Sequence, residues 1–143
     1  MIKIGLVSCV SKKKEGRHKA EELYVSPLFI YSRAYVKRYY DKWFILSAKH
    51  HLLVPGQTIE SYDENLKGKS AKEKEAWAQE TFRQISAHIK QHDGIIFIHA
   101  GMAYRKYLVP KLESAGYKIE IPLAGLRIGE QLSWYDKKTR YAC

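Results

Sequence analysis

The residues best suited to chemistry follow a short apolar run in the middle of the chain. The run WFIL ends at Ser47, and Lys49 and His50 come directly after it. Tyr62 and Asp63 close the same segment after a Pro-Gly break. Open α/β sheets bind ligands just beyond the carboxyl ends of their strands. We therefore expect a site here.

Each of these side chains has a defined candidate role. His50 is the candidate acid/base, because an ordinary imidazole pKa near 6.5 suits proton transfer at neutral pH. Asp63 is the candidate catalytic carboxylate, while Tyr62 and Ser47 would contact the substrate. Lys49 would bind phosphate or, if desolvated, act as a nucleophile. The alternative for each is an ordinary surface residue.

A second group follows the N-terminal run IKIGLV. Ser8, Ser11 and Lys12 are candidate anion-binding residues, and Lys13 is a candidate for both anion binding and catalysis. A basic loop after the first strand of an α/β unit can cradle an anion. The glycines of a Walker A loop are missing, and a solvated turn is the alternative.

Cys9 lies where this first run meets the basic loop. Nearby lysines would favour its thiolate, which could act as a nucleophile with His50 or His51 as base. The alternative is a small residue buried under the loop. The lack of a local cysteine-enzyme signature favours burial.

A third group follows the run IIFI, which ends at His99. Gly101 would let a ligand approach the backbone closely, at a helix start suited to anions. Tyr104 and Arg105 could clamp an anion, and Gln131 on the last helix could reach the same place.

Composition limits the classes of partner. The chain has 143 residues and a net charge of +10, which favours anionic partners, nucleic acid or nucleotides above all. Its two cysteines and scattered histidines match no metal-ligand spacing, so we predict no metal and no cofactor. With neither a membrane-length apolar run nor a secretory signal, we expect no membrane partner and a cytoplasmic location.

Strand and helix candidates alternate along the chain. The expected strands are 2–8, 43–46, 95–98 and 117–121, and the expected helices are 26–40, 70–92, 102–114 and 126–138. Residues 57–69 read as a long loop, and Pro110 should kink or shorten its helix.

This alternation predicts a single α/β domain over residues 1–143, with a parallel four-stranded sheet and helices on both faces. The expected strand order is 2-1-3-4, with the switch point between the first and third strands. In that order the ends of the first three strands converge on one cleft.

Five blocks of sequence carry a family resemblance over most of the chain. SCVSKKK, ELYVSPLF, LSAKHHLLVPGQTIESYD, HAGMAYRKYLVPKL and IPLAGLRIGEQLSW resemble a poorly characterised family of bacterial and phage proteins. The block at 46–63 is also similar to the YaaA family of peroxide-stress proteins, which are linked to DNA binding. His51 stands where that family block leads us to expect glycine.

The spacing of Cys9 and Lys13, followed by Tyr24 and Ser26, resembles the core motif of archaeosine synthase. In that family a lysine attacks a 7-deazaguanine nitrile in tRNA. The resemblances imply a connection with nucleic acid or a modified base.

Three hypotheses follow. The first is a protein that binds a nucleotide, nucleobase or nucleic acid at the strand ends and acts on a base or nucleotide there. The second is a non-catalytic DNA- or RNA-binding protein of the YaaA stress type, whose binding would fall steeply with salt. The third is an interaction module that targets a host protein.

Overall fold

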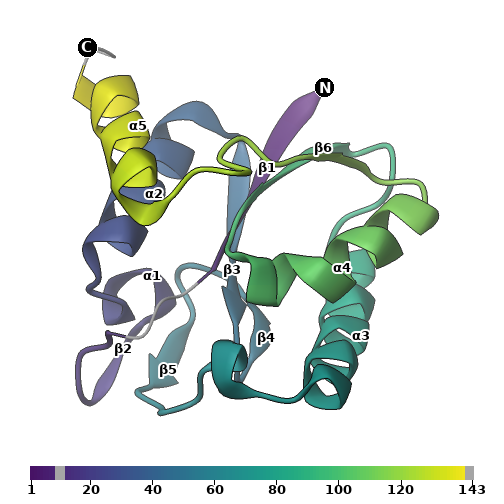
Figure 1. The fold of residues 1–143 in the computed structure, drawn as a ribbon, viewed down its shortest axis with the longest axis horizontal. Helices are drawn as coiled ribbons and strands as arrows, with labels where there is room; N and C mark the ends of the chain where they lie inside the picture. Colours follow the sequence, from purple (N-terminus) through teal and green to yellow (C-terminus); the bar gives the residue numbers. More distant parts are fainter. Residues whose placement is uncertain (9–11, 141–143) are drawn as a thin grey trace.

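A five-stranded sheet with helices on both faces forms the centre of the computed structural model (Figure 1). The structure describes residues 1–8 and 12–140. The strands are, in spatial order, β4 (His51–Leu53), β3 (Lys42–Ser47), β1 (Ile2–Ser8), β6 (Gly94–His99) and β7 (Lys118–Glu120). β3, β1, β6 and β7 are parallel, and β4 is antiparallel to β3.

The four predicted strands lie in the predicted order, but the prediction of an all-parallel four-stranded sheet is wrong. The turn after Ser47 sends the chain back along β3 as β4, and Leu53 pairs with Ile45. His51 makes this return with a φ of 65°, in the left-handed region that glycine adopts most easily. That backbone conformation accounts for the glycine expected at this position.

Helices cover both faces of the sheet (Figure 1). α2 (Pro27–Tyr39) and α5 (Ile128–Arg140) pack together on one face, and α3 (Ala71–His88) and α4 (Met102–Ser114) on the other. The side chain of Ser26 accepts a hydrogen bond from the N–H of Phe29, as the Ser-Pro start predicts. Ser70 and Glu73 form the predicted capping box of α3.

Two helix predictions need correction. α3 ends at His88, four residues before the predicted end, because Ile89 is already extended. α4 is not shortened at Pro110 and continues to Ser114.

β1 is the central strand, and its residues 4–7 are all buried. Such a run is typical of a strand covered on both faces. A Cβ atom on Gly5 would lie 2.6 Å from the ring of Tyr40, at the end of α2. The glycine therefore allows this ring to pack directly against the strand.

Besides β4, four short elements were not predicted: β2 (Arg17–Lys19), α1 (Ala20–Leu23), β5 (Thr58–Glu60) and the 3-10 helix η1 (Leu66–Gly68). β2 pairs with β5 in a second sheet, so the expected loop at 57–69 is partly ordered by long-range pairing. The basic segment at residues 12–14 is held against residues 23–25 by two backbone hydrogen bonds. The N–H of Lys14 donates to the carbonyl of Leu23, and the N–H of Val25 donates to the carbonyl of Lys12.

Over the described part of the chain, none of the helices has the length and apolar character needed to cross a membrane.

Candidate functional site

A cleft of about 620 Å³ lies at the carboxyl ends of β1 and β6. Ser8 ends β1 and His99 ends β6, and both line this cleft. The chain crosses from one side of β1 to the other between β3 and β6, so the cleft lies at a topological switch point. Ligands of open α/β sheets bind at such points.

Six of the predicted site residues line the cleft, and they come from every predicted group except the segment after β3. They are Ser8, Lys13, Gly101, Tyr104, Arg105 and Gln131. The strand-end argument thus brings together residues that are far apart in the sequence.

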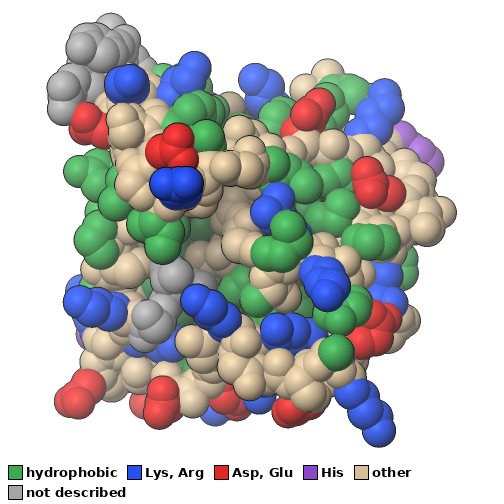
Figure 2. Space-filling view, in the orientation of Figure 1, with side chains coloured by type: hydrophobic (Ala, Val, Ile, Leu, Met, Phe, Trp, Pro, Cys, Tyr) green, Lys and Arg blue, Asp and Glu red, His purple; other side chains and the backbone are tan. Residues whose placement is uncertain are grey.

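The cleft has more basic than acidic side chains in its described lining. Lys13, Lys67 and Arg105 line it, and none of the three has a carboxylate within 4.0 Å in the described ranges. Glu64 also lines it, but lies 3.8 Å from the ammonium of Lys69. Figure 2 shows this face hollowed, with Lys and Arg side chains at several points around the hollow. An anionic ligand is therefore favoured.

The start of α4 adds a second anion-binding feature. Gly101 caps this helix without a side chain, and open space surrounds its Cα. The N-terminal N–H groups of a helix carry partial positive charge. Arg105 lies one turn further along, and its buried Nε has no hydrogen-bond partner among the described residues. A ligand could supply that partner.

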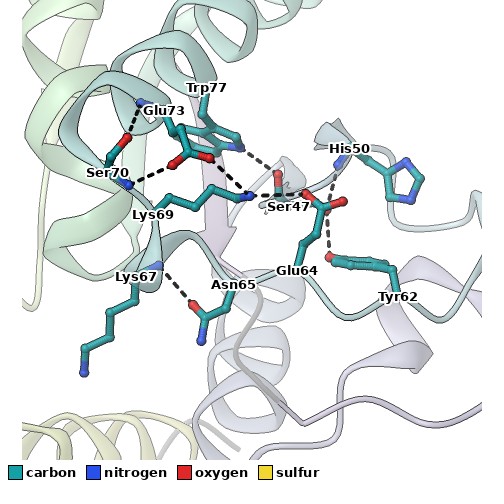
Figure 3. Close-up of polar contacts among 10 residues, drawn as sticks. All are labelled: Ser47, His50, Tyr62, Glu64, Asn65, Lys67, Lys69, Ser70, Glu73 and Trp77. Atoms are coloured by element: carbon teal, nitrogen blue, oxygen red, sulfur yellow. Dashed lines mark hydrogen bonds and ion pairs between the residues drawn. The ribbon is translucent and has the colours of Figure 1, made fainter.

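Three hydroxyl groups form a chain beside the cleft, which we call the hydroxyl cluster: Tyr24, Tyr62 and Ser47. The Tyr62 oxygen lies 2.6 Å from that of Tyr24 and 2.7 Å from that of Ser47. Ser47 Oγ also accepts the backbone N–H of His50, and its carbonyl accepts the indole N–H of Trp77 at 2.8 Å (Figure 3). Ser47 is fully buried, so these contacts fix the end of β3.

Lys13 connects the hydroxyl cluster with the cleft. Its ammonium lies 4.6 Å from the centre of the Tyr62 ring, and the ammonium of Lys49 lies 5.9 Å from it. Both distances are within the range of cation–π attraction. Because Lys13 also lines the cleft, it links the cleft with the hydroxyl cluster.

His50 also contacts Tyr62. Its ring meets the Tyr62 ring edge to face, with the centres 5.4 Å apart. Burial lowers its pKa below the ordinary value, and the charge of Lys49 lowers it further. The imidazole is therefore mainly neutral at pH 7 and able to accept a proton. Its buried Nε2 has no hydrogen-bond partner within the described segments.

A buried histidine that the sequence marked only as a strand end forms part of the cleft wall. His99 Nε2 lies 2.6 Å from the hydroxyl of Tyr40, and its Nδ1 lies 2.7 Å from that of Tyr135. Burial lowers the pKa of His99 to about 4 and raises the pKa of both tyrosines. The three groups are thus neutral at pH 7 and join α2, β6 and α5.

Some predicted site residues lie elsewhere. Lys12, Lys49 and Asp63 are exposed and do not line the cleft, and Ser47, His50 and Tyr62 are beside it rather than in its lining. Cys9 and Ser11 lie outside the described residues.

Sequence reasoning missed five further polar side chains of the cleft lining, which are Ser32, Glu64, Asn65, Lys67 and Tyr135. Asn65 and Lys67 lie in the segment expected to be a loop, where no local pattern marks them. Within the described ranges, no three His, Cys, Asp or Glu side chains are grouped as metal ligands.

The fold and the cleft define an α/β protein with a ligand-sized hollow at its switch point. A family model matches residues 4–137, and the chain belongs to that family, DUF6884, whose function is unknown. It is also 34% identical over 70 residues to the uncharacterized protein YfjM of Bacillus subtilis (strain 168). That alignment covers 44% of this chain and 47% of YfjM, so it spans about half of the relative's length.

No solved structure matches the chain. Neither the family nor the relative connects it with YaaA proteins or archaeosine synthase. Those two resemblances therefore remain interpretations of the sequence blocks that carry them.

Proposed function

We propose that the cleft binds a nucleotide or nucleobase and that the neighbouring hydroxyl cluster acts on it. The observation that carries this proposal is the cleft itself: about 620 Å³ at the switch point, lined by cations without carboxylate partners in the described chain. Ligand pockets typically measure about 300–1,000 Å³, so a nucleotide is of suitable size.

The lining supports separate positions for the phosphate and the base. Lys13, Arg105 and the start of α4 would bind the phosphate, since helix N-termini and guanidinium groups are common phosphate ligands. Asn65 and Gln131 carry amide groups that both donate and accept hydrogen bonds, which suits the edge of a base.

Apolar side chains supply the faces against which a base could lie. Phe29, Leu126 and Tyr135 line the cleft from α2, the loop before α5 and α5 itself. Their contact would desolvate the base, while the amides fix its orientation.

Lys13 would hold the phosphate of the ligand close to the hydroxyl cluster. It reaches the cleft and contacts Tyr62 at the same time. His50, whose ring contacts that of Tyr62, would accept a proton, consistent with its lowered pKa. The class of chemistry is thus general acid–base catalysis, in which a proton of the bound base or nucleotide is transferred to His50.

The test is calorimetric titration with nucleoside monophosphates and free bases. Lys13→Gln and Arg105→Gln should each weaken nucleotide binding about tenfold, because a hydrogen bond to a charged group contributes about 1.5–3 kcal/mol. Lys12→Gln is the matched control, since Lys12 has the same charge in the same segment but does not line the cleft.

Equal affinity for wild type, Lys13→Gln and Arg105→Gln would contradict the proposal. The alternative is a non-catalytic nucleic-acid-binding protein, for which the net charge of +10 is the motive. In that case the Lys12 and Lys13 variants should weaken oligonucleotide binding equally, and no base or nucleotide should be altered on incubation.

A further inference from the structure

We propose that the occupant of the cleft is one nucleotide of a single-stranded nucleic acid, whose neighbouring phosphates bind a groove beside the cleft. This inference rests on the proposed function of the cleft. We call this the lysine groove; it measures about 360 Å³ and is lined by Lys67, Ala71, Lys74, Met102, Ala103, Lys106 and Tyr107.

The lysine groove continues the cleft across the surface. Lys67, Met102 and Ala103 line both hollows, so a ligand leaving the cleft at this side enters the groove directly. In Figure 3, the side chains of Asn65 and Lys67 point away from the ion pairs of Lys69. A strand of phosphates could therefore follow Lys67 from one hollow to the next.

The groove is positively charged because its lysines lack acidic neighbours. Three of its seven lining residues are lysines and none is acidic, which favours a ligand carrying several negative charges. Among the described residues, Lys67, Lys74 and Lys106 form no ion pair within 4.0 Å.

Lysines near the groove, in contrast, form ion pairs. Lys69 lies within 4.0 Å of Glu64 and Glu73, and Lys111 is paired with Glu75. Carboxylates thus pair with lysines around the groove, whereas the lysines in the groove remain available to bind phosphate.

The groove also has an apolar part, which suits bases rather than phosphate alone. Met102 is 59% exposed at the boundary between the two hollows, and Tyr107 lines the groove on the same helix. Single strands bind through a basic path with side chains on which bases can stack. A base that enters a cleft must be unpaired, which favours a single strand over a duplex.

The experiment compares mononucleotides with short single-stranded DNA and RNA oligonucleotides on the full chain. We expect the oligonucleotides to bind at least tenfold more tightly. The double variant Lys74→Gln/Lys106→Gln, at groove positions outside the cleft lining, should remove that gain and leave mononucleotide binding within about threefold of wild type. Its slope of log affinity against log salt should be smaller by about 1.4, since each phosphate contact on a single strand contributes about 0.7.

The matched control is Lys72→Gln/Lys118→Gln, which loses the same charge at exposed positions outside both hollows. Oligonucleotide binding no tighter than mononucleotide binding, or equal effects of the two double variants, would overturn the inference and leave the proposed function standing. Oligonucleotide binding that needs the groove but is unaffected by Lys13→Gln and Arg105→Gln would instead overturn the proposed function, and with it the occupant named here.

Discussion

Tyr62 holds together groups that come from four parts of the chain. Its hydroxyl contacts those of Tyr24 and Ser47, and its ring lies beside Lys13 and His50. A single side chain therefore contacts both the other members of the hydroxyl cluster and Lys13, which lines the cleft.

Replacing Tyr62 with Phe should destabilise the protein by about 1–3 kcal/mol. The ring and its cation–π contacts remain, but the hydroxyl groups of Tyr24 and Ser47 each lose one hydrogen bond, and a typical intramolecular hydrogen bond contributes about 0.5–1.5 kcal/mol net. Urea denaturation measures the change. Tyr31→Phe is the control, since Tyr31 is an exposed tyrosine of α2, and equal effects of the two variants would contradict the role assigned to Tyr62.

His99 should make stability depend on pH. Its pKa is about 4 in the folded protein and near 6.5 in an unfolded chain. Between these values the unfolded state binds more protons than the folded state. The free energy of unfolding therefore rises by up to about 3 kcal/mol as the pH increases to about 6.5, and stays level above that pH.

Urea denaturation from about pH 4.5 to about pH 7 tests this dependence. His50 acts in the same direction, so the comparison is with His99→Gln, whose loss of stability at low pH should be smaller. NMR titration of the His99 imidazole gives a second measurement. An ordinary pKa near 6.5 there would show that the imidazole is not buried as described.

At the scale of elements, α4 contains a destabilising residue in its interior. Pro110 has no N–H to donate to the carbonyl of Lys106, yet the helix continues to Ser114. Packing of Leu108 and Leu112, both fully buried, holds the helix despite this loss.

Pro110→Ala should therefore stabilise the protein by about 1–3 kcal/mol, by restoring a helical hydrogen bond. Pro27→Ala is the matched control, because proline at the first position of a helix needs no N–H, and we expect it to be neutral or slightly destabilising. Thermal unfolding measures both. A loss of stability in Pro110→Ala would show that the proline is favoured by its packing.

The elements that the sequence predicts are those with a local signal. The runs of β1, β3 and β6 are apolar, and Ser26 and Ser70 are helix caps. β2, β4 and β5 have three residues each, too few to show a period. β2 and β5 form because distant backbones pair, and β4 forms by a hairpin with β3 whose turn contains neither glycine nor proline.

The same distinction applies to the candidate site. The strand-end argument assembled Ser8, Gly101 and Arg105, because it depends only on strand order. The contact of His99 with Tyr40 and Tyr135 depends on how α2 and α5 pack, and side-chain packing between distant helices has no signature in sequence.

At the scale of the whole molecule, the charge of +10 should destabilise the compact state when salt is low. Chloride relieves this repulsion by screening alone. Phosphate should do more, because an anion that binds the folded protein stabilises it by mass action.

We expect the melting temperature in sodium phosphate to exceed that in sodium chloride of equal ionic strength by about 2 °C or more. Differential scanning calorimetry measures the excess. It should shrink in Lys13→Gln/Arg105→Gln and persist in Lys12→Gln/Lys118→Gln, whose positions lie outside the cleft. An equal excess in both double variants would mean that phosphate binds diffusely over the surface.

The two outer strands of the main sheet, β4 and β7, have three residues each, whereas the three inner strands have six or seven. Each border of the sheet therefore offers few unpaired backbone groups to another molecule. Short borders of this kind hinder strand-to-strand aggregation. The protein should accordingly resist strand-to-strand aggregation, because each border strand is too short to pair with another chain over a long stretch.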